Sequence, residues 1–272
     1  MNTLAERLPL PFDADLERRF GGLRRLYGDA GYARIRAARV AIVGVGGVGS
    51  WAAEALARSG VAALTLIDLD HVAESNINRQ VQAVGATLGQ AKVQALRERI
   101  QDIHPGCEVT GVEEFVDESN WPMLLPRPVD AVIDACDQVR AKVAIAAWAL
   151  QTHSMLVIAG AAGGKRRPHA VEVEDLGLVT HDPLLASLRQ RLRKQHGAAR
   201  SGKIGVHCVF SREAVAPPDA SCSVDGEIGD GSLNCHGYGS SVGVTATFGM
   251  VAASLALESA AAQKRSGAEA LL

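Results

Sequence analysis

The stretch Gly44-Val45-Gly46-Gly47-Val48-Gly49 decides the fold of this chain. It follows a short β-branched run at residues 40–43, and residues 50–59 after it have the pattern of a helix that ends at Gly60. Glycine in such a turn lets backbone N–H groups approach a phosphate, and the N-terminus of the next helix favours the anion. The pattern predicts a strand, a turn and a helix that bind a nucleotide. NAD, FAD and ATP all use this geometry, so the nucleotide stays open at this point.

Apolar strands alternate with helical patterns through the first 160 residues. The expected strands lie at residues 40–43, 64–67, 129–133 and 155–158, and the expected helices at residues 50–59, 92–103 and 139–150. Strand, helix and strand joined by short links predict a Rossmann-like, doubly wound and mostly parallel α/β sheet with helices on both faces. We expect residues 1–165 to form the nucleotide-binding region of the domain.

The pattern changes in residues 166–272, which we expect to form a C-terminal extension of mixed strands and helices in the same domain. Asp182 and Pro183 begin a predicted helix that stops near Gly197, and a strand is expected at residues 204–210. Residues 212–241 read as a long loop. Residues 237–257 carry no charge and are long enough to span a bilayer, but they are rich in small residues. We expect a buried or dimer-facing helix, with membrane association as the alternative.

The composition excludes several classes of protein. With 47% hydrophobic and 21% charged residues in 272, the chain is not disordered, collagen-like or a coiled coil. The formal net charge of −2 means that nucleic-acid binding would require a local basic patch. The 5 cysteines include no CxxC pair, which argues against a disulfide framework and a four-cysteine zinc site. Since the first thirty residues show no secretory signal, we expect a cytoplasmic chain.

Polar residues gather where the next strands end. Asp68 follows the second strand, where an acid can hold ribose hydroxyls. Asn76-Ile77-Asn78-Arg79-Gln80 and Gly89-Gln90-Ala91-Lys92 each bring one cation, and Asp134 and Asp137 close the third strand. Hydride transfer from a nicotinamide does not require arginine, lysine and aspartate around the phosphates. Breaking the bond between the α- and β-phosphates does require them, because cations offset the developing charge and a carboxylate holds Mg²⁺.

The motifs GVGGVG, LTLIDLDHV, NINRQ, GQAK and VIDACD resemble, in this order, the adenylating enzymes related to ubiquitin-activating enzymes, which include the bacterial ThiF and MoeB proteins. The resemblance covers roughly residues 18–165. In that family a carboxylate attacks the α-phosphate of ATP, which yields an acyl-adenylate and pyrophosphate.

The resemblance also implies roles for individual residues. The expected ATP-binding residues are Gly44, Gly46, Gly47, Gly49, Asp68, Asp70, Asn76, Arg79, Lys92 and Asp137, the last of which would hold Mg²⁺. The expected catalytic residues are Arg79, Lys92, Asp137 and Arg25. Arg25 would match an arginine that relatives supply across a homodimer, and Arg19 is the alternative.

Three further segments narrow the resemblance to one branch of the family. Residues 19–28 (RFGGLRRLYG), residues 46–60 and the KIGVHCVFSREA segment from Lys203 resemble the branch that dehydrates N6-threonylcarbamoyladenosine beside the tRNA anticodon. The resemblance implies adenylation of the threonyl carboxylate and attack by the tethered urea group, so that no enzyme cysteine is needed. It implies a tRNA partner and leaves open a monovalent cation, a cysteine desulfurase and the sulfur acceptor of that desulfurase.

One short stretch is basic enough to bind tRNA. It contains six cations and no acid: Arg189, Arg191, Arg193, Lys194, Arg200 and Lys203. The run Lys165-Arg166-Arg167 adds three more. Such a density of charge predicts contacts with phosphates. The alternative is a solvated helix face.

Other functions remain open on the sequence. Adenylation of the C-terminus of a sulfur-carrier protein would require a working Cys222, whereas a nicotinamide-dependent oxidoreductase would be indifferent to Arg79. A silent scaffold for a cysteine desulfurase would survive the loss of Asp137. Two further expectations concern packing: Cys136 and Cys235 are interpreted as packing residues, and His207 as a core residue of its strand.

Overall fold

A seven-stranded sheet forms the centre of the computed structural model, which describes residues 14–216 and 238–263. The strand order is β3-β2-β1-β4-β5-β7-β6. The strands are β1 (Arg39–Val43), β2 (Ala63–Ile67), β3 (Glu108–Val112), β4 (Ala131–Asp134), β5 (Met155–Ala159), β6 (Val171–Asp175) and β7 (His207–Ser211). All pairs are parallel except β6 with β7. The predicted doubly wound, mostly parallel α/β sheet is confirmed.

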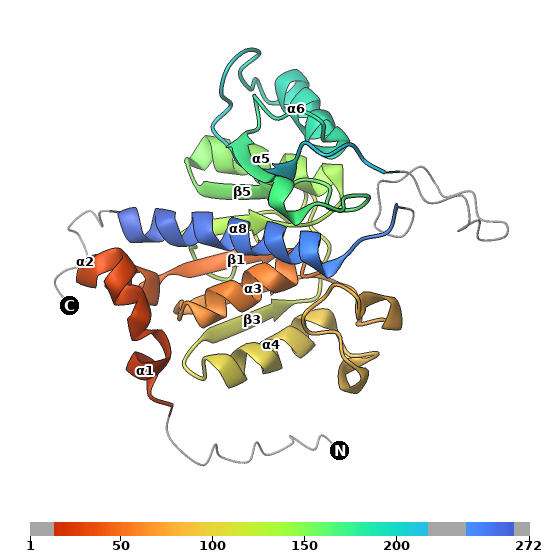
Figure 1. Cartoon of the computed structure of the whole chain (residues 1–272). Helices are drawn as coiled ribbons and strands as arrows, with labels where there is room; N and C mark the ends of the chain where they lie inside the picture. Colours follow the sequence, from red (N-terminus) through yellow and green to blue (C-terminus); the bar gives the residue numbers. More distant parts are fainter. Residues whose placement is uncertain (1–13, 217–237, 264–272) are drawn as a thin grey trace.

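Helices cover both faces of this sheet (Figure 1). They are α1 (Leu16–Phe20), α2 (Arg24–Ala37), α3 (Gly49–Arg58), α4 (Lys92–Ile103), α5 (Val139–Thr152), α6 (Pro183–Gln195) and α8 (Val242–Ala262), with short 3-10 turns η1 (Gly21–Leu23), η2 (Glu74–Asn76), η3 (Gly85–Thr87) and η4 (Pro168–Ala170). Helices α3, α4 and α8 share one apolar core, and α5 and α6 share the other.

Alternation along the strands builds these two cores. Val40 and Ile42 of β1 face the α3 side, whereas Ala41 and Val43 face the α5 side. Strands buried on both faces are expected to be apolar throughout, as β1 is. The chain runs outward from β1 to β2 and β3, then returns to β4 on the other side of β1 and continues outward to β5. The strand order therefore reverses between β1 and β4. A crevice therefore opens at the carboxyl ends of β1 and β4.

The C-terminal helix α8 lies in contact with α3 (Figure 1). A side chain at Gly249 would place its Cβ 2.8 Å from the amide nitrogen of Ala52, so glycine permits this close approach. At the other end of α8, Arg34 donates to the carbonyl oxygen of Ala261 at 2.7 Å. Among the described residues α8 is the one helix long and apolar enough to cross a membrane, and 44% of its most apolar window is buried against the rest of the chain.

Several local expectations differ from the structure. Strands β3 and β6 and helices α1 and α2 were not predicted, and the strand expected at residues 204–210 begins only at His207. His207 is exposed at the start of β7, so its interpretation as a core residue is wrong. The strands β3 and β6 lie at the edges of the sheet, where one face of a short strand can stay polar and weaken the apolar signal. Most of the predicted loop, residues 217–237, lies outside the described residues.

A buried histidine joins α4 to the N-terminal helices. His104, with 1% of its surface exposed, lies 4.8 Å from the ring of Phe20, and its Nε2 is 3.1 Å from Nη1 of Arg36. Burial, reinforced by Arg36 and Arg19, lowers the pKa of His104 from 6.5 to about 4. The folded chain therefore holds a neutral imidazole at physiological pH.

This shift predicts a pH-dependent stability. Below pH 6.5 the unfolded chain binds a proton at His104 that the folded chain excludes until about pH 4, so stability falls as the pH drops through this window. The loss should reach on the order of 2 kcal/mol. Thermal unfolding of His104→Gln between pH 7.5 and 5, compared with the unchanged chain, measures it. The variant should show a smaller slope, and an equal slope would contradict the assignment.

Candidate active site

A cavity of about 440 Å³ opens at the carboxyl ends of the central strands. Its walls come from the glycine turn, the ends of β2, β4 and β5, and the segment around η2. The lining includes Gly44, Gly46, Gly47, Asp68, Asp70, Asn76, Arg79, Gln80, Lys92, Cys136, Asp137, Gly163 and Thr245. The structure therefore brings together most residues predicted to bind a nucleotide.

The glycine turn is held by close backbone contacts. Gly44 has a φ of +80°, and a Cβ there would lie 2.8 Å from the amide nitrogen of Cys136. Gly49 packs against the carbonyl oxygen of Gly44, which leaves no room for a side chain. Gly46 and Gly47 line the cavity. No side chain caps the N-terminus of α3 at Val48. The amide of Ser50 donates to the carbonyl oxygen of Gly46 at 3.1 Å, and the positive end of the helix still favours an anion there.

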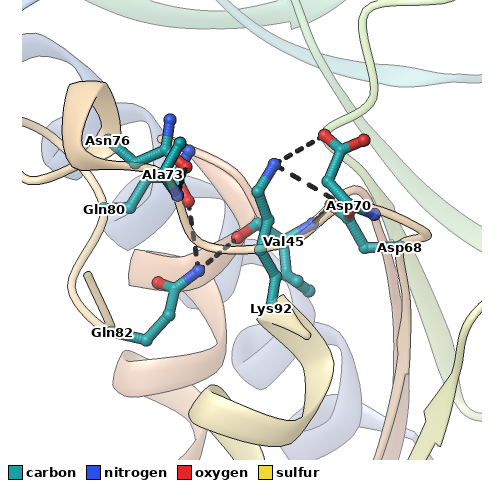
Figure 2. Close-up of polar contacts among 8 residues, drawn as sticks. All are labelled: Val45, Asp68, Asp70, Ala73, Asn76, Gln80, Gln82 and Lys92. Atoms are coloured by element: carbon teal, nitrogen blue, oxygen red, sulfur yellow. Dashed lines mark hydrogen bonds and ion pairs between the residues drawn. The ribbon is translucent and has the colours of Figure 1, made fainter. Parts of the chain in front are cut away.

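Asp68 supports the turn from the end of β2. Its Oδ2 accepts from the amide of Val45 at 2.8 Å, and its Oδ1 accepts from the amide of Asp70 at 2.9 Å (Figure 2). Burial raises the pKa of Asp68, while the neighbouring Lys92 opposes that shift. Both oxygens keep further lone pairs, so the carboxylate can still accept from ribose hydroxyls.

Lys92 is buried at the start of α4, and its ammonium is already paired. Its Nζ lies 2.6 Å from Oδ2 of Asp70 and 4.0 Å from Oδ1 of Asp68 (Figure 2). The side chain of Asp70 is 58% exposed, so its carboxylate is partly solvated and the ion pair is screened by water. To contact a phosphate, the Lys92 ammonium must either donate to the phosphate and to Asp70 at once or move away from Asp70.

The segment around η2 shapes the opposite wall. Arg79 donates through Nη1 to the carbonyl oxygen of Ser75 at 2.6 Å and to Oδ1 of Asn78 at 2.9 Å. Asn76 accepts from the amide of Ala73 at 3.1 Å (Figure 2). These bonds fix the segment and leave the remaining guanidinium donors of Arg79 at the cavity.

Two glutamines without a predicted role also hold the turn. Gln82 is buried and donates through Nε2 to the carbonyl oxygen of Val45 at 3.0 Å and to Oε1 of Gln80 at 3.2 Å (Figure 2). Gln80 belongs to the polar cluster seen in the sequence, but nothing in the sequence indicates that Gln82 reaches back to the glycine turn.

Asp137 is exposed at the cavity, whereas the N-terminal arginines lie elsewhere. Arg25 is exposed on α2 and does not line the cavity. Arg19 donates to the carbonyl oxygens of Asp102 and Ile103 at 2.9 and 2.7 Å, and it thereby caps the end of α4. Within one chain, neither arginine joins the site.

The predicted basic stretch is only partly exposed. Arg189 donates to the carbonyl oxygens of Leu176 and Val179 at 3.1 and 2.6 Å, and Arg193 donates to that of Ala199 at 2.9 Å. Lys165 is 3% exposed and donates to the carbonyl oxygen of Ser211 at 3.2 Å. Arg189 and Lys165 thus satisfy backbone carbonyls instead of presenting free charge. The exposed cations are Arg191, Lys194, Arg200 and Lys203, with Arg166 and Arg167 beyond them.

The cysteines offer no activated nucleophile in the described residues. Cys136 packs against the core beneath α5 and α6, as predicted, and it also lines the cavity, where its thiol donates to Oδ1 of Asp134 at 3.0 Å. Burial raises the pKa of this thiol well above its ordinary value, which keeps it protonated. Cys222 and Cys235 lie outside the described residues. The part of the chain that the structure describes holds no cluster of three or more metal-ligating side chains.

Comparisons with known proteins show which family the chain belongs to. The ThiF family model matches residues 19–268, so the chain belongs to the ThiF family. Within that family it belongs with the tRNA threonylcarbamoyladenosine dehydratases. It is 44% identical to that enzyme of Escherichia coli strain K12 over 247 residues, which cover 88% of this chain and 92% of the relative. The enzyme of Haemophilus influenzae is 38% identical over 247 residues, 89% of this chain and 93% of the relative.

Solved structures extend the similarity to three dimensions. The E. coli dehydratase in complex with ATP superposes with a TM-score of 0.81 at 42% identity, over 91% of this chain and 96% of that chain. By contrast, the molybdopterin-synthase adenylyltransferase of E. coli is 38% identical over only 109 residues, 40% of this chain and 43% of the relative. The similarity to the dehydratases thus includes the C-terminal region.

The geometry of Asp68 generates a prediction about nucleotide affinity. Asp68→Asn keeps an acceptor for Val45 but removes the charge that strengthens bonds from ribose hydroxyls, so the Kd for ATP should rise about 10-fold or more. Titration calorimetry measures it. Asp130→Asn is the matched control, because Asp130 also accepts a backbone amide, that of Arg39 at 2.8 Å, but does not line the cavity. An unchanged Kd in Asp68→Asn would contradict the ribose assignment.

Proposed function

We propose that this chain catalyses the ATP-dependent dehydration of N6-threonylcarbamoyladenosine next to the tRNA anticodon. The observation that carries the proposal is the extent of the similarity: the E. coli dehydratase matches 88% of the chain, whereas the E. coli molybdopterin-synthase adenylyltransferase matches 40%. The cavity at the glycine turn supplies the nucleotide site that such a reaction requires.

The reaction proceeds in two steps. The threonyl carboxylate attacks the α-phosphorus of ATP, which forms an acyl-adenylate and releases pyrophosphate. A nucleophilic atom of the tethered urea group then attacks the acyl carbon, so that a ring closes and AMP leaves with the carboxylate oxygen. The net loss from the nucleoside is one water. Tethering makes the second step intramolecular, which accounts for a site without an activated cysteine in the described residues.

Each wall of the cavity has a task in the first step. The turn at Gly46 and Gly47 and the N-terminus of α3 cradle phosphate oxygens. Asp68 orients the ribose. Arg79 and Lys92 offset the negative charge that develops as pyrophosphate leaves, and Lys92 does so by turning from the solvated carboxylate of Asp70.

A magnesium ion fits this site through the nucleotide. Mg²⁺ is held in many sites by one or two carboxylates together with substrate phosphates. Asp137 is an exposed carboxylate on the cavity wall beside the glycine turn, and it suits that arrangement. When bound there, the ion would neutralise charge on the phosphates.

A second copy of the chain completes the proposal. Arg25 lies outside the cavity of its own chain, so its predicted catalytic role requires a homodimer in which it reaches the partner's cavity. In this proposal the C-terminal region, residues 166–272, contributes dimer packing and contacts to tRNA. The monovalent cation, the cysteine desulfurase and its sulfur acceptor stay predictions.

The tRNA surface is assigned to the exposed cations alone. They are Arg191, Lys194, Arg200 and Lys203, on α6 and the segment that follows it. Arg191 and Lys194 are both exposed, and because they are three residues apart they are neighbours on the surface of the helix. With a tRNA substrate of this kind, we expect the enzyme to act in the cytoplasm.

The decisive experiment supplies ATP, Mg²⁺ and tRNA that bears or lacks the threonylcarbamoyl group. After digestion, the nucleosides are weighed by mass spectrometry. We expect a loss of one water in the modified tRNA only, with AMP formed in equal amount. ATP binding without a change of mass would reject the proposal and favour a protein carboxylate, such as that of a sulfur carrier, as the acceptor.

A charge reversal tests the tRNA surface. Arg191→Glu combined with Lys194→Glu should weaken tRNA binding about 10-fold and reduce the slope of log Kd against log salt by about 1 to 2, because two phosphate contacts are lost. ATP affinity should not change. The control is Arg127→Glu, which reverses an exposed charge near the start of β3, where Arg127 pairs with Glu108. Equal effects of both changes on the Kd for tRNA would reject the surface.

A further inference from the structure

A fully buried ion pair lies beneath the cavity wall. Asp134 is the last residue of β4, and Lys142 lies in the first turns of α5. Both side chains are 0% exposed, and Nζ of Lys142 is 3.1 Å from Oδ1 of Asp134. Neither residue lines the cavity, although Ala135, Cys136, Asp137 and Gln138 between them do.

Stability alone does not account for this pair. Removing two charges from water is costly, and an apolar pair of similar volume is often as stable or more so. A cation near the N-terminus of a helix is also opposed by the helix dipole, and Lys142 occupies that position in α5. The ion pair between Lys142 and Asp134 is therefore expected to have a role other than stabilising the fold.

Lys142 joins the ends of two strands. Besides the carboxylate, its Nζ donates to the carbonyl oxygen of Ala159 at 3.0 Å and to that of Asp134 at 3.4 Å. Ala159 is the last residue of β5, so one ammonium crosslinks the carboxyl ends of β4 and β5. The segments that leave these strands, residues 135–138 and 160–163, both line the cavity.

Asp134 passes this constraint to the next turn. Its Oδ1 also accepts from the amide of Cys136 at 3.2 Å and from the thiol of Cys136 at 3.0 Å. Its Oδ2 is buried and has no hydrogen-bond partner among the described residues, so Lys142 and Cys136 alone orient the carboxylate. The backbone of Cys136 in turn meets Gly44, where a Cβ would lie 2.8 Å from its amide nitrogen.

We propose that Lys142 is a positioning residue for nucleotide binding and adenylation. Through Asp134 and Ala159 it holds the turn at residues 135–138, and this turn sets both the place of Gly44 and the direction in which Asp137 faces the phosphates. The inference rests on the proposed function for the identity of the nucleotide and the reaction.

The test removes the charges while it preserves volume. In Lys142→Met with Asp134→Asn, no buried charge is left unpaired, so Tm should stay near that of the unchanged chain. Methionine cannot donate to Ala159, and the two strand ends lose their crosslink. We expect the Kd for ATP, measured by calorimetry in Mg²⁺, to rise about 10-fold, and kcat for tRNA dehydration to fall at least 10-fold.

The matched control is a second ion pair away from the cavity. Glu54 of α3 is 4% exposed and lies 2.7 Å from Nε of Arg99 on α4. Glu54→Gln with Arg99→Met should change Tm but leave the Kd for ATP and kcat within about 2-fold. Wild-type Kd and kcat in the Lys142 and Asp134 variant would overturn the proposal.

Two further arms keep the test decisive. Should the double variant fail to fold, Lys142→Leu with Asp134→Asn removes the donor to Ala159 by another uncharged substitution, and the same two outcomes apply to it. Should the unchanged chain bind ATP without dehydrating tRNA, the proposed function fails, while the Kd for ATP still decides the role of Lys142.

Discussion

The contact between two backbones, that of Gly44 and that of Cys136, is the constraint on which the site depends. It brings the end of β1 against the turn after β4 and leaves no room for a side chain between them. The glycine turn and the turn that carries Asp137 are therefore packed against each other and are expected to move together. Interiors packed this closely transmit a shift at one position to its neighbours.

The rest of the molecule supports this contact from three sides. From below, Lys142 and Asp134 crosslink the ends of β4 and β5. From β2, the carboxylate of Asp68 accepts the amide of Val45. From the opposite face, α8 packs so closely on α3 that position 249 admits only glycine without a shift of the backbone of Ala52. The long apolar helix is thus part of the nucleotide site by packing, even though it supplies little of the lining.

The cationic side chains at and beneath the cavity wall already have hydrogen-bond or ion-pair partners. Lys92 rests on Asp70, Arg79 on backbone and amide oxygens, and Lys142 on Asp134. Only the first pair is partly solvated, so a phosphate can displace Asp70 at modest cost, whereas breaking the buried pair would strand a charge. This difference separates cations that can act on a nucleotide from one that holds the site in shape.

The α/β sheet, the glycine turn and the main polar residues of the cavity wall could be predicted from the sequence alone. The periodicity of apolar residues and the spacing of glycines are local signals that can be read along the chain. The carboxyl ends of parallel strands lie at one edge of a sheet, so the polar residues that follow the strands are expected to meet there. Residues 40–43 and the helix at residues 92–103 show this most clearly.

Which charged side chains are free depends on contacts between residues that are distant in the chain. In the sequence, Arg189 and Arg191 look equivalent, yet one caps loop carbonyls and the other faces solvent. Lys165 and Lys142 likewise appear as ordinary cations and are buried. Arg19 binds the end of α4, and Gln82 reaches the glycine turn from 37 residues away. Each outcome depends on a partner distant in the chain, and no local pattern encodes where the backbone of that partner will present an unpaired carbonyl.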